Sequence, residues 1–294
     1  MERIRRSLHF VPGSSEKMFE KALTLPADSL ILDLEDSVAS GKKVDARRQV
    51  VEWLQQADFG RREKLVRINP MDSDFGRDDL EAVIAAKPDG LVIPKAENAK
   101  ILVALDSLIQ ELEKHHRLDV GSVKLHLVAT ETAAAVFNLQ QMAALDRVAG
   151  MSWGAEDLSF SLGASSSRDE NGEYRDVFRV VRSMTLLAAV AGDAQPIDAV
   201  YVEIGNLKGL QAECRQAAAM GFTAKLTVHP DQIEIVNDAF TPGPDAIAAA
   251  RELIAAFAAN ADKGAFLFQG QMVDIPHLKR AEKLLAVAKL LQES

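Results

Sequence analysis

The stretch Ser29–Asp36 has the sequence SLILDLED, in which a short apolar run ends in three carboxylates. A run of this length, bounded by polar residues, is typical of a buried β-strand. The segment Ala46–Ala57, a little further on, has the apolar spacing of an amphipathic helix. One strand followed by one helix is the unit of parallel α/β folds, and the same unit recurs along the chain.

Eight such units are predicted. Strands are expected at Leu8–Val11, Ser29–Leu34, Lys64–Ile68, Gly90–Pro94, Lys124–Ala129, Arg147–Ser152, Ala199–Ile204 and Ala224–Val228. Helices are expected at Ser14–Leu25, Ala46–Ala57, Asp78–Ala86, Asn98–His116, Thr132–Leu145, Asp176–Ala191, Leu207–Met220 and Pro230–Ala239. Eight alternating units favour an α/β fold of the (β/α)₈ TIM barrel type. An open doubly wound sheet would need a GxGxxG turn after its first strand, where this chain has Val-Pro-Gly-Ser-Ser.

Two segments fall outside this repeat. Residues 161–175 form a polar loop, SLGASSSRDENGEYR, which could act as a lid on the βα side of a barrel. The tail from Pro242 onward contains a helical stretch, Asp245–Ala259, and then a short apolar segment followed by another helix. We therefore predict a catalytic barrel over residues 1–240. Residues 241–294 are predicted to be a C-terminal helical extension that packs on the barrel's outside or on a neighbouring subunit.

The composition limits the class of protein. A chain of 294 residues with 48% hydrophobic content can bury a full-sized core, and barrels of this type use about 250 residues. A net charge of -9 argues against nucleic-acid binding, which needs a basic face. The N-terminus lacks the apolar run of a signal peptide, and no stretch approaches the ~20 apolar residues of a membrane span. We expect a cytoplasmic protein with no membrane partner.

Ionisable residues follow nearly every predicted strand at its carboxyl end, which is where barrel enzymes carry their active sites. They are Asp33, Glu35 and Asp36 after strand two, Arg67 in strand three, Lys95 after Pro94 in strand four, Glu131 after strand five, Glu156 and Asp157 after strand six, Glu203 in strand seven and His229 after strand eight. Polar residues belong at strand ends in any barrel. Acids and bases at so many of them favour a catalytic site.

The acids indicate a metal site, because several carboxylates in one pocket need protons or a cation. Oxygen ligands without a Cys or His cluster favour Mg²⁺, or Mn²⁺, over zinc. Arg67 could then hold a substrate carboxylate through two N–H groups, although an ion pair with the nearby acids would also explain it. Lys95 could contact anions or form a Schiff base with a keto acid.

The same segments resemble the citrate lyase β-subunit-like proteins of the HpcH/HpaI aldolase family. The resemblance runs in order along essentially the whole chain. It is carried by RSLHFVPGSSEKMFEKA, ADSLILDLEDSV, LVRINP, DGLVIPKAE, ATETAAAV, WGAEDLSFSLGA, PIDAVYVEI, GFTAKLTVHPDQIEIVNDAFTP and GAFLFQGQMVDIPHLKRAE.

This resemblance implies a magnesium-dependent carbon–carbon lyase. Its substrate would be a 3-hydroxyacyl-CoA thioester of the malyl, citramalyl or citryl type, cleaved into (or formed from) an acyl-CoA and a keto acid. Glu131 and Asp157 match the family's metal ligands. Arg67 matches its residue for the keto-acid carboxylate, and Pro94 and Lys95 fall at the substrate as well.

The resemblance also implies acids for proton transfer. Glu35 and Asp36 match acids that support metal-bound waters or acid–base steps. Asp274 matches an acid that the tail delivers into a neighbouring subunit's site, which implies a homo-oligomer, with a trimer favoured. After predicted strand seven, the chain has Ile204–Leu207 where relatives often carry an acid, so substrate choice need not follow any known member.

Two other functions remain open. One is an aldolase for free hydroxy-keto acids without CoA, and the other is the β subunit of a multi-subunit citrate lyase. The segments DLEDSV and MVDIPHLK favour the thioester branch. The long tail and the polar loop at 161–175 favour a free-standing enzyme.

Overall fold

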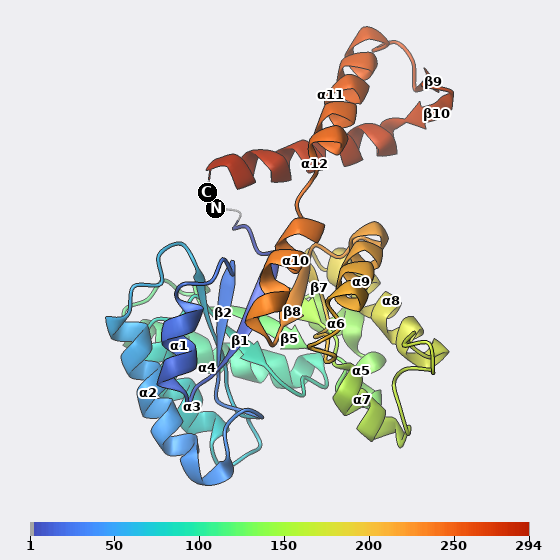
Figure 1. The fold of residues 1–294 in the computed structure, drawn as a ribbon. Coiled ribbons are helices and arrows are strands. Elements are labelled where there is room, and N and C mark those ends of the chain that lie inside the picture. Colours follow the sequence, from blue (N-terminus) through green and yellow to red (C-terminus); the bar gives the residue numbers. More distant parts are fainter. Residues whose placement is uncertain (1–2, 294) are drawn as a thin grey trace. The chain divides into compact units, whose positions relative to one another are not determined.

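The computed structural model describes residues 3–293 and contains a closed barrel of eight parallel strands (Figure 1). Each strand pairs with the next along the chain, and the eighth returns to the first, where Ser7 lies opposite Lys225. The predicted fold class is confirmed. The strands are β1 (Ser7–Pro12), β2 (Ser29–Asp33), β3 (Glu63–Arg67), β4 (Gly90–Ile93), β5 (Lys124–Val128), β6 (Val148–Ser152), β7 (Gln195–Asp198) and β8 (Ala224–Thr227).

Helices follow the strands, close to where the sequence predicts them. They are α1 (Glu16–Ala22), α2 (Lys43–Gln56), α3 (Gly76–Ala85), α4 (Ala99–His115), α5 (Ala133–Val136), α6 (Leu139–Ala143), α7 (Ala155–Leu162), α8 (Asp176–Ala191), α9 (Leu207–Met220) and α10 (Ile233–Ala239), with 3₁₀ turns η1 (Ser40–Lys42) and η2 (Pro230–Gln232). The helix predicted over Thr132–Leu145 is divided into α5 and α6. Helix α7, which the sequence analysis does not predict, begins directly after β6 and ends at Gly163 in the left-handed conformation common at helix ends.

Two apolar layers hold the barrel together. Alternate residues of a strand face opposite sides of the sheet. On β2, Ile31 therefore belongs to the cluster inside the barrel, whereas Leu30 and Leu32 pack in the layer beneath the helices. Gly150 on β6 keeps the interior open for its neighbours, because a Cβ there would lie 2.6 Å from Nδ1 of His126.

The seventh strand is the one whose predicted position was wrong. It was expected at Ala199–Ile204, but β7 spans Gln195–Asp198. The run of apolar and β-branched residues after position 198 resembles a strand, whereas Pro196 and Asp198 resemble a turn. Asp198 is nevertheless buried, because Lys225 and Arg182 form ion pairs with its carboxylate. Glu203 therefore lies beyond the strand, where its carboxylate accepts a hydrogen bond from Asn206.

The chain divides into two compact units, of which Arg5–Asn237 is the barrel. The other comprises Asp238–Ser294 together with Met1–Ile4. Its elements are α11 (Pro244–Ala259), a hairpin of β9 (Ala265–Phe268) and β10 (Gln271–Asp274), and α12 (Ile275–Glu293). Within this unit the rings of Phe257 and Phe266 pack with their centroids 4.8 Å apart. Across the described residues 3–293, no helix is long and apolar enough to cross a membrane.

Candidate active site

A cavity of about 610 Å³ opens at the carboxyl ends of the barrel strands. Its polar lining comes from separate parts of the chain, and includes Asp33 at the end of β2, Arg67 at the end of β3, and Glu131 after β5. Asp157, in the first turn of α7, also lines it. The rest of the wall is largely apolar, which is the usual character of a small-molecule site.

Arg67 lies at the centre of the polar contacts. The pairing register places Arg67 opposite Asp33, so both side chains point into the barrel mouth. The guanidinium donates two parallel hydrogen bonds to Asp33, with Nε–Oδ1 at 2.6 Å and Nη2–Oδ2 at 2.7 Å. It also lies over the ring of Phe10, 4.7 Å from the centroid. Burial alone would raise the pKa of Asp33, but the hydrogen bonds and charge of Arg67 hold it below its usual range.

Two further acids contact the same guanidinium. Nη1 of Arg67 lies 2.9 Å from Oε2 of Glu35 and 3.4 Å from Oδ2 of Asp36. The Glu35 side chain is 4% exposed and that of Asp36 is 60% exposed, so Glu35 is a buried partner of Arg67 and Asp36 is an accessible one. Burial raises the pKa of Glu35, against the opposing charge of Arg67. Of the two, only Asp36 lines the cavity.

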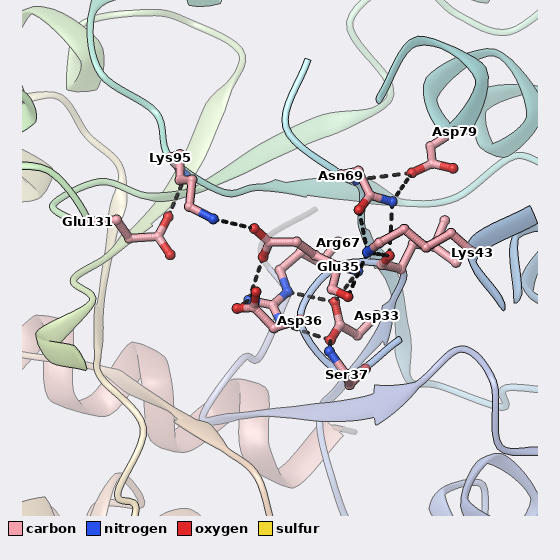
Figure 2. Close-up of polar contacts among 11 residues, drawn as sticks. Asp33, Glu35, Asp36, Ser37, Lys43, Arg67, Asn69, Asp79, Lys95 and Glu131 are labelled. Atoms are coloured by element: carbon pink, nitrogen blue, oxygen red, sulfur yellow. Dashed lines mark hydrogen bonds and ion pairs between the residues drawn. The ribbon is translucent and has the colours of Figure 1, made fainter. Parts of the chain in front are cut away.

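A layer of polar contacts supports the loop that carries these acids (Figure 2). The Lys43 ammonium donates to the backbone oxygens of Leu34 and Glu35, at 3.0 and 2.9 Å, and to Oδ1 of Asn69 at 2.6 Å. Asn69 in turn donates to Oδ2 of Asp79 at 2.6 Å. The same two carbonyls also accept hydrogen bonds from the Asn69 side-chain amide and from the Val38 N–H. Together these bonds fix the backbone of the loop after β2.

Glu131 is a buried carboxylate, 4% exposed, at the opposite side of the site from Asp33. Its side chain accepts a hydrogen bond from the backbone N–H of Lys95. The Lys95 ammonium donates to Oε1 of Glu35 at 3.0 Å, so Lys95 lies between the two acids (Figure 2). Gly154 gives Glu131 its space, because a Cβ there would approach Cγ of Glu131 to 2.9 Å.

The electrostatics of Glu131 fit a cation site. Burial raises its pKa to about 8, and the neighbouring carboxylates of Glu35 and Asp157 add to this against the Lys95 hydrogen bond. Near neutral pH, such a group binds a proton unless a cation takes the proton's place. Among the described residues no group of three or more His, Cys, Asp or Glu is arranged to hold a metal. A pair of carboxylates is nevertheless enough for Mg²⁺, which keeps several positions for water and substrate.

Most of the residues predicted from the sequence meet in this cavity. Arg67, Asp33, Asp36, Glu131, Glu156, Asp157 and His229 line it, whereas Glu35, Pro94 and Lys95 are not part of the lining. Asp274 belongs to the other compact unit, where its Oδ1 lies 2.6 Å from Nδ1 of His277. Its predicted role in a neighbouring subunit's site stays a prediction.

Sequence reasoning missed several contributors. His9 lines the cavity, with its Nδ1 3.0 Å from Oγ1 of Thr227, and burial lowers its pKa to about 4, so the ring is neutral. A single histidine inside an apolar strand gives no signal that it borders a site. Gly154 could have been suspected, because a glycine directly after a strand often marks a close approach. Lys43, on a surface-like helix pattern, could not.

The fold and the site together define a (β/α)₈ barrel protein with an acidic cavity at the carboxyl ends of its strands and a buried arginine beside it. A model of the HpcH/HpaI aldolase/citrate lyase family matches residues 6–230, and the chain belongs to this family. A (3S)-malyl-CoA thioesterase of Cereibacter sphaeroides is 38% identical over 97% of this chain and 95% of its own. The mitochondrial citramalyl-CoA lyase of Rattus norvegicus is 36% identical over 98% of this chain and 87% of its own.

A solved structure is also similar. It is that of CitE from Mycobacterium tuberculosis in complex with magnesium, acetoacetate and coenzyme A. Its TM-score is 0.81 and its sequence identity is 39%, over 97% of this chain and 98% of that chain. The resemblance deduced from the sequence segments is therefore confirmed.

Proposed function

We propose that this protein is a magnesium-dependent carbon–carbon lyase. It splits a 3-hydroxyacyl-CoA thioester of the malyl, citramalyl or citryl type into an acyl-CoA and a keto acid. The observation that carries the proposal is the convergence of Glu131, Asp157 and Arg67 on one cavity. It is supported by relatives of nearly full length that are named for acting on citramalyl-CoA and malyl-CoA.

Glu131 and Asp157 would hold the metal, because they line the same cavity and the Glu131 carboxylate favours a bound cation over a bare charge. A bound Mg²⁺ supplies a Lewis acid for oxygens that gain negative charge in the reaction. Mn²⁺ is an alternative ion for the same oxygen donors.

Arg67 would bind the carboxylate that becomes part of the keto acid. Asp33 fixes the guanidinium plane through two hydrogen bonds, so little conformational freedom is lost when an anion binds. The exposed Asp36 carboxylate lines the cavity 3.4 Å from Nη1, and it would give way to the substrate. The apolar wall, which includes Phe10, Val128 and Leu226, excludes water from the reacting carbons.

Cleavage requires two proton transfers. A base removes the proton of the 3-hydroxyl group as the carbon–carbon bond breaks, and the bonding electrons pass to the thioester enolate. An acid then protonates the enolate carbon. Within the barrel, Asp36 is better placed than Glu35, which is bound by Arg67 and Lys95 away from the cavity lining. Asp274 from a neighbouring subunit is the second proposed acid, in a homo-oligomer that we propose to be a trimer.

The proposal is tested by incubating the protein and Mg²⁺ with malyl-, citramalyl- and citryl-CoA. A lyase releases glyoxylate, pyruvate or oxaloacetate in step with an acyl-CoA, and no free thiol. The same panel measures the second candidate function, thioester hydrolysis, which the malyl-CoA thioesterase relatives favour. Hydrolysis releases free CoA thiol and no keto acid. If no thioester yields a keto acid in the presence of Mg²⁺, the lyase proposal is wrong.

A further inference from the structure

The backbone at Lys95 is unusual for its place in the fold. Its φ is +50°, in the left-handed region that residues with a Cβ seldom adopt. The other non-glycine residues with positive φ in the described chain lie where this conformation is routine. They follow the ends of helices α3, α4 and α8 or form the turn of the β9–β10 hairpin, at Lys87, Arg117, Asp193 and Gln269. Lys95 instead follows a barrel strand at the candidate active site.

This conformation lets one residue contact two acids. The N–H of Lys95 donates to Glu131, and its ammonium reaches Oε1 of Glu35 at 3.0 Å (Figure 2). The torsion φ links the plane of this N–H to the chain that follows. A change to the usual negative φ, of roughly 110°, would therefore turn either the N–H away from Glu131 or the chain away from its path to α4. With the chain on this path, the N–H contacts Glu131 only when φ is positive.

Glu131 has few other restraints. Gly154 leaves room for its Cγ, and no ion pair with a Lys or Arg restrains its carboxylate within residues 3–293. The Lys95 N–H is thus the polar group that fixes the rotamer of Glu131. Contacts that orient a ligand carboxylate commonly change metal affinity by about 10–100-fold when they are lost.

We propose that Lys95 is a positioning residue that aims Glu131 at the metal through its backbone N–H, and that its left-handed conformation is required for this. The inference rests on the proposed function, in which Glu131 is a metal ligand. The role belongs to the backbone and not to the charge of the side chain. We therefore expect the metal affinity of each variant to depend on how readily residue 95 adopts a positive φ.

Three substitutions distinguish a role of the Lys95 backbone from a role of its side-chain charge. Lys95→Gly, Lys95→Ala and Lys95→Val all remove the ammonium, but glycine adopts positive φ freely, alanine with difficulty and β-branched valine hardly at all. Lys95→Met is the matched control, because it removes the charge and keeps an unbranched side chain of similar length.

The measurement is the binding of Mn²⁺ alone, followed by electron paramagnetic resonance on the full-length protein without substrate. We expect the Kd to stay within about twofold of wild type for Lys95→Gly and to rise about tenfold or more for Lys95→Val. Lys95→Ala and Lys95→Met, which share an unbranched Cβ, should lie together between them. Thermal melts show whether each variant is folded. If the valine variant does not fold, the comparison of glycine with alanine carries the test.

Equal affinities in the glycine, alanine and valine variants would overturn the inference, since they share the loss of charge. A glycine variant as weak as the valine variant would do the same. Glu131→Ala locates the site, and unchanged Mn²⁺ binding in it refutes the metal-ligand assignment itself. Failure of the proposed function is recognised separately, as graded Mn²⁺ binding in a protein that cleaves no thioester.

Discussion

Two clusters of charged side chains lie on opposite faces of the barrel sheet, and each is built around an ion pair between neighbouring strands. In each, the strand register places an acid beside a base: Asp33 opposite Arg67 on β2 and β3, and Asp198 opposite Lys225 on β7 and β8. The inner cluster consists of Asp33, Glu35, Asp36, Arg67, Lys95 and Glu131. The outer cluster consists of Asp198, Glu213, Arg168, Arg182 and Lys225. Asp198 and Lys225 are next in sequence to Ile197 and Leu226, whose side chains face the barrel interior. The side chains of Asp198 and Lys225 therefore face the helices.

The outer cluster satisfies itself. Asp198 accepts from Arg182 and Lys225 at 2.9 and 2.8 Å, and Glu213 accepts from Lys225 and Arg168 at 2.9 and 2.7 Å. Burial alone would raise the pKa of Asp198, but the charges of Lys225 and Arg182 lower it to about 2. Such a cluster holds strands and helices in register, and both of its carboxylates are paired with cations, of which it has three.

The inner cluster does not satisfy itself. It has four carboxylates, at Asp33, Glu35, Asp36 and Glu131, against the two cations of Arg67 and Lys95. Glu131 is the carboxylate in excess, and burial raises its pKa to about 8. The difference teaches that buried charge by itself does not identify a site. A buried carboxylate that lines a cavity and has no paired cation does.

The largest expected effect comes from removing the unbalanced acid. Glu131→Ala should reduce Mg²⁺-dependent cleavage by ~10³-fold or more, equivalent to ~4 kcal/mol of transition-state stabilisation, because a metal ligand is lost. The metal-free protein should remain as stable as wild type or become more stable. Keto-acid release and thermal melts in a chelator measure the two effects. Full turnover by the variant would contradict the assignment of Glu131.

The outer cluster should respond in the opposite way. Asp198→Ala leaves Arg182 and Lys225 buried without their acid, and we expect it to lower the free energy of unfolding by about 3–5 kcal/mol. Denaturant unfolding measures this loss.

Asp36→Ala is the matched control for stability, because its carboxylate is 60% exposed and also forms an ion pair with an arginine. It should cost less than about 1 kcal/mol. A loss as large as that of Asp198→Ala would show that the two clusters do not differ in how much their ion pairs contribute to stability.

Much of the fold follows from local pattern. The run Ser29–Asp33 has an apolar centre, is of strand length and is wholly buried, and the same pattern placed seven of the eight strands within one or two residues. The failure at β7 has a definite cause. Asp198 is tolerated in a buried strand only because Arg182, 16 residues earlier, and Lys225, 27 residues later, reach it. Partners so distant leave no mark on the local sequence.

The candidate site was predictable to the extent that it depends on strand ends. Arg67, Glu131 and Asp157 follow three different strands, and barrel closure brings them to one cavity. Their mutual contacts were not predictable, because they depend on backbone dihedral angles and on support from Lys43 and Asn69. Sequence reasoning assigned Lys95 by its charge. The structure adds a contact through its N–H, which every residue but proline could supply.

The two clusters are also expected to differ in the pH dependence of stability. The ordinary pKa of a glutamate is 4.5 and that of Glu131 in the folded, metal-free protein is about 8. Between these values the unfolded chain loses a proton that the folded protein keeps, so stability falls as pH rises, by at most ~1.4 kcal/mol per pH unit. Glu131→Gln has no such proton. In a chelator, the variant should therefore become increasingly more stable than wild type as pH rises from 5 to 8, and this difference should disappear when Mg²⁺ is added.

The lowered pKa of Asp198 makes stability depend on pH in the opposite direction. Its contribution to stability is present above its ordinary pKa of 3.8 and is lost as pH falls toward 2. Chemical denaturation of wild type and Glu131→Gln across this pH range decides the matter. A constant difference would mean that Glu131 carries its charge in the folded protein without a metal, and the contrast between the two clusters would then disappear.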